Sequence, residues 1–258
     1  MHNQERYAPF VRTLAALDKA LVQRKWKDVV NLSNQILADP KASQLGNEVL
    51  SSCYLNRGSA LRRLGSKAEA LEDCRKASEL NPANFKPHHN AALILAQDFE
   101  DYEEGLKEFN KALGLNPTST EALSSRGLTK MLLDDLSGAE ADLRTALSID
   151  PNHVDALCNL GNLYSKQGEF EQAAEVYKKA LDIAPQDYEV RYNLALALRY
   201  MGSNHAAESV LRQDKKALQM WESRSGIRVQ RGIPWHLVLF LIVAFIVVLL
   251  IVMLRFSS

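Results

Sequence analysis

The 258-residue sequence lacks an excess of charge of either sign. It contains 31 basic and 31 acidic residues, so its formal net charge is zero. A protein dedicated to nucleic acid needs a surplus of Lys and Arg, because these side chains neutralise the phosphates. We therefore expect no nucleic-acid partner.

Cysteine is scarce, and the sequence has no metal-binding motif. Cys53, Cys74 and Cys158 are far apart and form neither a CxxC motif nor a Cys/His cluster, which is typical of reduced thiols in the cytosol. His88 and His89 would point about 100° apart on a helix, so they cannot bind one ion together. We expect no metal site. We expect Cys74 in the core, and Cys53 and Cys158 to be more exposed.

Catalytic motifs are absent as well. The sequence shows no Gly-rich phosphate loop, no metal-ligand spacing and no motif of a catalytic triad. Its first residues also lack the apolar stretch and the small-residue cleavage site of a secretory signal. We therefore predict a protein that is not an enzyme, binds no cofactor and carries no secretory signal.

One long stretch lacks charge almost completely. Arg255 is the only charged residue between Gly232 and Ser258, and residues 237–254 are all apolar. A helix over 233–254 would be about 33 Å long at 1.5 Å per residue, which spans a hydrocarbon core of about 30 Å. We predict a single transmembrane helix at 233–254. Because only four residues follow it, the arrangement resembles that of a tail-anchored protein.

The residues before this span are basic. Between 214 and 231, five basic residues against two acidic ones give a local charge of +3, so the positive-inside rule predicts a cytosolic N-terminal domain and a basic juxtamembrane linker at 222–232. The span is strongly apolar with one downstream Arg, which favours the endoplasmic reticulum; the mitochondrial outer membrane is the second alternative and a prokaryotic inner membrane a third. The residues expected to flank the membrane are Arg224, Arg228, Arg231, Trp235 and Arg255.

Prolines recur at a nearly constant interval in the rest of the chain. Pro82, Pro117, Pro151 and Pro185 are separated by 35, 34 and 34 residues, and each follows a helix end that contains Ala: KASELNP, KALGLNP, TALSIDP and KALDIAP. Each interval holds two amphipathic helical patterns, with Pro as the stop signal after the second. A fixed period of this length indicates a helical repeat protein.

The segment 154–187 shows the repeat most completely. Gly161 and Ala173 fall at repeat positions 8 and 20, where small residues let two helices cross, and Tyr164 and Tyr177 fall at positions 11 and 24. This pattern resembles the tetratricopeptide repeat family, which implies an all-α, right-handed superhelical solenoid of about six helix pairs over residues 5–221. The repeats are placed near 10–43, 51–84, 85–119, 120–153, 154–187 and 188–221.

Two repeats depart from the regular length. The third has 35 residues, and we place its extra residue in the turn at 97–102. The helical pattern before Ser51 predicts that the first helix of the second repeat is extended backward.

The resemblance implies a peptide-binding groove lined by the first helix of each repeat. At repeat position 6 stand Asn56, Asn90, Asn159 and Asn193, with Ser125 interrupting the row. A side-chain amide both donates and accepts, so a row of amides can bind the backbone of an extended peptide. The row resembles the asparagine ladder in the tetratricopeptide part of O-linked N-acetylglucosamine transferase. The residues predicted to line the groove are Asn56, Lys86, Asn90, Asn159, Asn162 and Asn193.

A second resemblance concerns chaperone adaptors, whose three-repeat clamp binds a C-terminal carboxylate. The sequence from Tyr54 to Pro82 is similar to the middle repeat of such a clamp; Asn56 matches its Asn, and Lys86 matches the Lys of the third repeat. The clamp is incomplete, because its other three positions hold neutral or acidic residues. Asp18 in particular would repel a carboxylate. These unmatched positions are Leu14, Asp18 and Asn90.

Together these patterns predict a membrane-anchored adaptor or receptor whose groove faces the cytosol and binds a protein or peptide. Two alternatives remain open. One is a chaperone-recruiting co-factor for protein targeting or folding at the membrane, with a chaperone C-terminal peptide as its ligand. The other is a structural subunit of a membrane complex.

Overall fold

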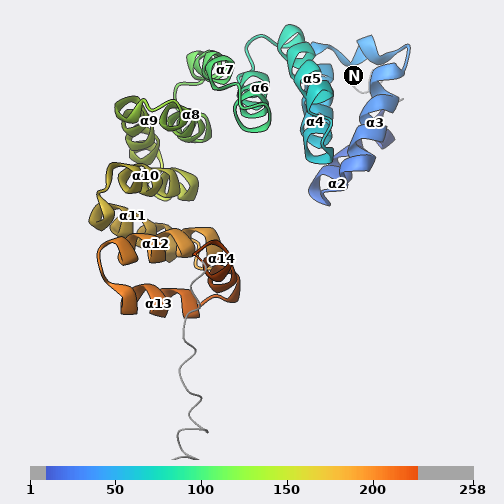
Figure 1. Ribbon diagram of the computed structural model, residues 1–258. Coiled ribbons are helices and arrows are strands. Elements are labelled where there is room, and N and C mark those ends of the chain that lie inside the picture. Colours follow the sequence, from blue (N-terminus) through green and yellow to red (C-terminus); the bar gives the residue numbers. More distant parts are fainter. Residues whose placement is uncertain (1–9, 226–258) are drawn as a thin grey trace, which may run out of the picture. The chain divides into compact units, whose positions relative to one another are not determined.

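The computed structural model describes residues 10–225, which form thirteen α-helices and two short helical turns without any β-strand (Figure 1). The predicted all-α class is confirmed. The helices are α2 (Val11–Val22), α3 (Trp26–Ala38), α4 (Asn47–Leu64), α5 (Lys67–Leu80), α6 (Lys86–Leu93), α7 (Tyr102–Leu115), α8 (Thr120–Leu132), α9 (Leu136–Ile149), α10 (Val154–Gln167), α11 (Phe170–Ile183), α12 (Tyr188–Tyr200), α13 (Asn204–Arg212) and α14 (Lys215–Ser225); the turns are η1 (Ala42–Leu45) and η2 (Ile94–Asp98).

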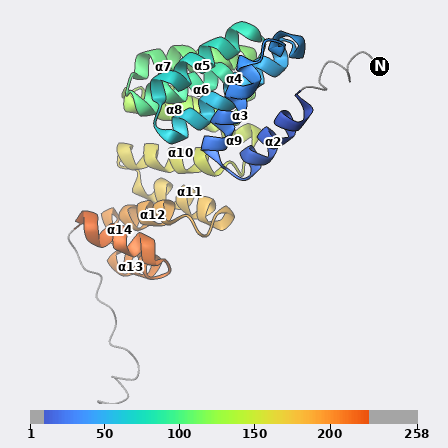
Figure 2. The ribbon, with the colours of Figure 1, turned by 90° about the vertical axis from the view of Figure 1, so that its right-hand side faces the viewer.

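The chain divides into two compact units, Met1–Pro185 and Gln186–Ser258. The first contains α2 to α11, in which each helix packs against the next one along the chain. Figures 1 and 2 both show α10 and α11 side by side as one such helix pair. The second contains α12 to α14, with α14 packed against both α12 and α13. The predicted right-handed solenoid over residues 5–221 includes helices of both units. That the two units form one uninterrupted solenoid stays a prediction.

Short capped turns define the helix pairs. Helix α8 begins after Ser119, whose hydroxyl accepts a hydrogen bond from the Ala122 amide at 3.3 Å, and α9 begins after Asp135, whose carboxylate accepts from the Gly138 amide at 2.9 Å. Such N-caps satisfy amides that have no partner within the helix. Helix α10 is followed by the C-cap residue Gly168, which adopts the left-handed conformation with φ 81°, a conformation that favours glycine. The chain can therefore reverse within a few residues.

Small residues lie where the two helices of a repeat cross, as the sequence predicts. A Cβ atom added to Gly161 would lie 2.5 Å from Cε1 of Tyr177, a side chain that is only 1% exposed. At the equivalent Gly127, an added Cβ would lie 2.9 Å from Cγ of Leu143. The large residue on the second helix thus occupies the space that the glycine leaves free.

We expect Gly161→Ala to destabilise the protein and Gly114→Ala, its matched control, to stabilise it. The first substitution overpacks the crossing and costs about 1–3 kcal/mol. The second lies in α7 with nothing within 4 Å of the added Cβ, and replacing a helical glycine by alanine contributes about 0.5–1 kcal/mol. Urea unfolding followed by circular dichroism measures both, and equal effects would contradict the crossing geometry.

The extra residue of the third repeat lies within its first helix. Helix α6 continues into the π-helical turn η2, and such a turn accommodates one additional residue. The predicted placement at 97–102 overlaps this turn only at Gln97 and Asp98, so the irregular segment begins earlier than predicted. The reason is an interaction with the preceding repeat: Arg62 of α4 donates to Gln97 Oε1 at 2.9 Å and forms an ion pair with Asp98.

Helix α4 begins at Asn47, so the predicted backward extension before Ser51 is confirmed. The prediction of an exposed Cys53 was wrong, because this side chain is only 2% exposed. Leu45 of η1 belongs to the same apolar cluster as Cys53. Burial raises the pKa of the Cys53 thiol to about 11, with a smaller contribution from the nearby Asp18 carboxylate. Cys74 lies in the core as predicted, and Cys158 is half-buried.

In the part of the chain from residue 10 to residue 225, no helix has both the length and the apolar character needed to cross a membrane. The predicted span at 233–254 lies outside the described residues. Helix α14 extends to Ser225, so the first residues of the predicted linker at 222–232 are helical.

Candidate peptide-binding surface

Two of the predicted groove asparagines connect the first helices of consecutive repeats. Asn90 of α6 donates from Nδ2 to Ser59 Oγ of α4 at 3.2 Å. Asn159 of α10 donates from Nδ2 to Ser124 Oγ of α8 at 3.1 Å and to the Ser124 carbonyl at 3.4 Å. Both asparagines are half-buried. The packing therefore fixes the orientation of each amide.

The two amides still have hydrogen-bonding atoms available for a ligand. Within residues 10–225, the side-chain oxygens of Asn90 and Asn159 accept no hydrogen bond. An amide oxygen can accept two hydrogen bonds and the amide nitrogen can donate two, so each side chain can pair with a peptide backbone while it holds its serine. Sequence reasoning missed Ser59 and Ser124, because they lie 31 and 35 residues before their partners and occupy different repeat positions.

The other predicted groove residues differ in their surroundings. Asn56 is half-buried on α4, and Lys86 is exposed at the first position of α6. Asn162 accepts a hydrogen bond from the Tyr177 hydroxyl at 2.7 Å, so it orients a core side chain. Asn193 lies on α12 in the second unit. The structure thus gives Asn90 and Asn159, among these residues, a direct contact with the preceding first helix.

The first repeat contributes no cation at the clamp positions. Leu14 packs against the apolar cluster that contains Leu45 and Cys53. Asp18 is exposed on α2 and close enough to Cys53 to raise the pKa of its thiol. This agrees with the sequence-based view that the carboxylate clamp is incomplete.

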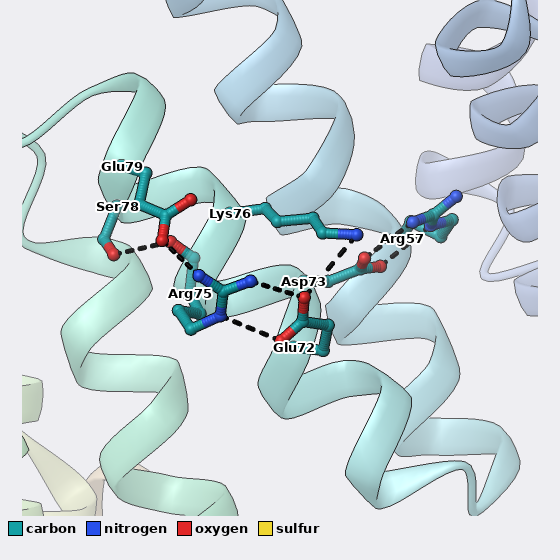
Figure 3. A network of polar contacts seen from close by, with 7 residues as sticks. All are labelled: Arg57, Glu72, Asp73, Arg75, Lys76, Ser78 and Glu79. Carbon is teal, nitrogen blue, oxygen red and sulfur yellow. Dashed lines mark hydrogen bonds and ion pairs between the residues drawn. The ribbon is translucent and has the colours of Figure 1, made fainter.

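An arginine fork connects the three helices α3, α4 and α5. Arg57 of α4 donates from Nε and Nη2 to the two carboxylate oxygens of Asp73 at 2.8 and 2.6 Å (Figure 3). It also donates from Nη1 to Asn34 Oδ1 of α3 at 2.6 Å. Asp73 is only 2% exposed, and the Asp73 carboxylate raises the pKa of Arg57. Such a planar, bidentate pair fixes direction as well as distance.

The same fork recurs two repeats later. Arg126 donates to the two oxygens of Asp142 at 2.8 and 2.6 Å and to Asn110 Oδ1 of α7 at 2.8 Å. In the repeat at 154–187, Leu160 and Val176 occupy the same two positions. Sequence reasoning missed the forks, although an Arg and an Asp separated by 16 residues in both repeats were a usable signal. The same two repeat positions therefore hold an ion pair in two of these repeats and an apolar pair in the third.

We expect Asp73→Val alone to destabilise the protein more than Arg57→Leu and Asp73→Val combined. The single substitution leaves a largely buried guanidinium without its carboxylate and costs about 3 kcal/mol. The combined substitution reproduces the apolar pair of the repeat at 154–187, so we expect a change below about 1.5 kcal/mol. Chemical denaturation measures both, and a double variant as unstable as the single one would contradict this interpretation.

One of the five predicted membrane-flanking residues lies in the described range. Arg224 is in the last turn of α14, with its guanidinium carbon 5.4 Å from the centre of the Tyr192 ring of α12. Arg199 of α12 lies 5.4 Å from the centre of the Trp221 ring of α14. Cation–π contacts thus connect these two helices. Arg228, Arg231, Trp235 and Arg255 lie outside the described residues.

Across residues 10–225, no three His, Cys, Asp or Glu side chains are grouped so that they could hold a metal ion. The two adjacent histidines have separate surroundings. His88 Nδ1 lies 2.7 Å from Glu108 Oε2. The ring of His89 packs edge-on against that of Phe109, with the ring centres 5.9 Å apart. Burial lowers the pKa of His89.

Family models match three segments of the chain. Two models described as tetratricopeptide repeat match residues 154–187 and 51–84, and a model described as TPR repeat matches 130–168. Two of these segments have the same bounds as two of the repeats predicted from the sequence.

Curated relatives share the repeats over part of their length. The small glutamine-rich tetratricopeptide repeat-containing protein 2 of Mycosarcoma maydis is 25% identical over 54% of this chain and 37% of its own. The Hsp70-Hsp90 organizing protein of Triticum aestivum is 30% identical over 63% of this chain and 28% of its own. The human protein O-mannosyl-transferase TMTC3 is 27% identical over 65% of this chain and 20% of its own. The chain thus spans about a third or less of the length of most of these relatives.

Solved structures show the same fold. The pilus biogenesis factor PilW is 17% identical with a TM-score of 0.67, over 81% of this chain and 97% of its own. A tetratricopeptide repeat protein from Parabacteroides merdae is 21% identical with a TM-score of 0.61, over 81% of this chain and 78% of its own. The chain therefore contains tetratricopeptide repeats and has the fold of a tetratricopeptide repeat protein.

Proposed function

We propose that the protein is an adaptor that binds an extended segment of a partner protein along the first helices of its repeats. The observation that carries the proposal is the pair of asparagines, Asn90 and Asn159, each held by a serine of the preceding first helix with its side-chain oxygen still available. Such amides recognise a peptide backbone whatever its side chains are. The ladder gives affinity, and neighbouring side chains such as Lys86 and Ser125 give selectivity.

We further propose that the apolar residues 233–254 hold the repeats at a membrane, with the groove in the cytosol and the endoplasmic reticulum as the favoured location. The support is the charge-free run itself and the basic residues before it. Attachment raises the local concentration of a captured partner at the membrane without any new contact. In this proposal the protein is a binding protein and not an enzyme.

A chaperone-recruiting co-factor is the second candidate. It is favoured by the similarity to a protein named Hsp70-Hsp90 organizing protein and by the matching positions of Asn56 and Lys86. The exposed Asp18 disfavours it, because this carboxylate would face the charge of the ligand.

We expect Asn90→Ala combined with Asn159→Ala to reduce recovery of partner proteins at least tenfold. Each lost side-chain-to-backbone hydrogen bond costs about 0.5–1.5 kcal/mol, and 1.4 kcal/mol is a factor of ten in affinity. The measurement is quantitative mass spectrometry of proteins that co-purify with the tagged full chain in detergent. Asn152→Ala, an exposed asparagine in the turn before α10, is the matched control. Recovery equal to that of the control would overturn the ladder, provided the double variant keeps its helical circular dichroism.

A chaperone C-terminal peptide separates the two candidates. We expect this peptide to bind the full chain with a Kd weaker than about 1 mM, because the first repeat offers no cation for the carboxylate. Fluorescence anisotropy with the labelled peptide measures the affinity. Micromolar binding that Lys86→Ala abolishes would favour the chaperone co-factor instead.

A further inference from the structure

Two arginines of the second unit are stacked on aromatic rings. Arg199 in the last turn of α12 lies over the Trp221 ring of α14, and Arg224 in the last turn of α14 lies over the Tyr192 ring of α12. The two rings also contact each other edge-on, with their centres 6.0 Å apart. Trp221 is only 4% exposed. The aromatic pair therefore forms a fixed base for both guanidinium groups.

Both guanidinium groups keep their hydrogen-bond donors. A stack on a ring face uses the positive charge but none of the five N–H groups. Arg199 and Arg224 are exposed, and within residues 10–225 neither forms an ion pair or a hydrogen bond. In the first unit, by contrast, Arg57, Arg62 and Arg126 each bind a carboxylate. The two stacked arginines are thus available for an external anion.

Helices α12 and α14 run in the same direction. Lys216 Nζ, near the start of α14, lies 5.5 Å from the centre of the ring of Tyr188, the first residue of α12. Trp221 in the second half of α14 lies beside Arg199 at the end of α12. The two helix starts are therefore at one end of the unit, and the two arginines are at the other.

The carboxylates of the second unit do not face the two arginines. Glu208 of α13 is paired with Arg212. From residue 215 to residue 258, Glu222 is the one acidic residue in the sequence. It comes two positions before Arg224, so it points about 160° away from it around the helix. The remaining carboxylates are at the helix starts, and they are Asp187, Glu189 and Asp214.

Two exposed side chains with apolar surface follow Arg199. Tyr200 is 64% exposed and Met201 is 37% exposed. Tyrosine is enriched where a membrane meets water, because its ring is apolar and its hydroxyl is polar. The ends of α12 and α14 thus combine two cations with side chains that suit the headgroup layer of a bilayer.

The sequence after α14 limits how far this end can lie from the proposed membrane span. Seven residues separate Ser225 from Ile233, and a fully extended chain of this length reaches at most about 28 Å. Two of the seven, Arg228 and Arg231, are basic and none is acidic. A short basic connection keeps the bilayer surface within reach of the stacked arginines, so a lipid phosphate is the anion that they meet first.

We propose that the ends of α12 and α14 bind the phosphate groups of anionic phospholipids, which rests on the membrane attachment proposed above. Arg199 and Arg224 each donate N–H groups to a phosphate, because a guanidinium matches a phosphate in a bidentate geometry. Tyr200 and Met201 enter the headgroup layer beside them. The second unit then lies on the bilayer surface instead of moving at the end of its linker.

Energy transfer from Trp221 to a dansyl-labelled lipid headgroup tests the proposal in the full chain. Trp26→Phe with Trp235→Phe leaves Trp221 as the one tryptophan of the sequence. The chain is placed in lipid nanodiscs of phosphatidylcholine, either alone or with one third phosphatidylserine. We expect at least twofold more efficient transfer in the discs with phosphatidylserine. High salt should remove the difference, because it screens the charges.

Three double substitutions in this background identify the groups that contact the lipid. Arg199→Gln with Arg224→Gln should lower the transfer in discs with phosphatidylserine to the phosphatidylcholine level. Arg199→Lys with Arg224→Lys retains both charges and should keep the twofold difference. Lys178→Gln with Lys179→Gln removes the same charge from the exposed side of α11, and we expect no change from this control.

Failure of the attachment and failure of the lipid contact give different results. A chain that does not enter the discs contradicts the attachment, and the lipid contact falls with it. A chain that enters the discs but shows equal transfer in both kinds overturns the lipid contact alone, and an acidic protein is then the ligand to test. The proposal is also overturned if the Gln pair keeps the difference. Loss of the difference in the Lys pair overturns it too, since the arginines would then act through the stack and not through their charge.

Discussion

The close approach of two helices at a pair of small residues is the constraint on which the structure depends. At Gly161 the second helix comes so near that no Cβ fits beside Tyr177. This contact sets the position of the first helix relative to the second within a repeat. Because each helix of the first unit also packs against the next one, the same constraint places the first helices of consecutive repeats close enough for a side-chain amide to reach from one to the other.

Polar contacts fix the relative direction of the helices, which apolar packing alone does not determine. Burial is non-directional, whereas the forks at Arg57 and Arg126 each define the direction of three helices with hydrogen bonds of 2.6–2.8 Å. Asn90 and Asn159 do the same between first helices, and they retain acceptors for a ligand. The candidate binding surface is therefore part of the scaffold, so a ligand meets amides that are already oriented and whose ordering costs little on binding.

Features set by local patterns could be predicted from the sequence, and features set by contacts between repeats could not. The period of the prolines and the small residues at positions 8 and 20 sufficed to predict the helix pairs and the role of Gly161. The partners of Asn90 and Asn159 were out of reach, because Ser59 and Ser124 occupy different repeat positions. The π-helical turn was not predicted, since it is held by Arg62 of another repeat. Cys53 was misjudged because it belongs to an apolar cluster that includes Leu45 of η1, a segment that precedes the regular repeat.

The central claim is that the partner lies along the first helices, over the asparagine row. Photocrosslinking from one residue in that row tests it most directly. A benzophenone amino acid at position 125, in the row on α8, should crosslink the partner, and the same group at position 137, exposed on the second helix α9, should not. Crosslinks from position 137 and none from position 125 would contradict the account.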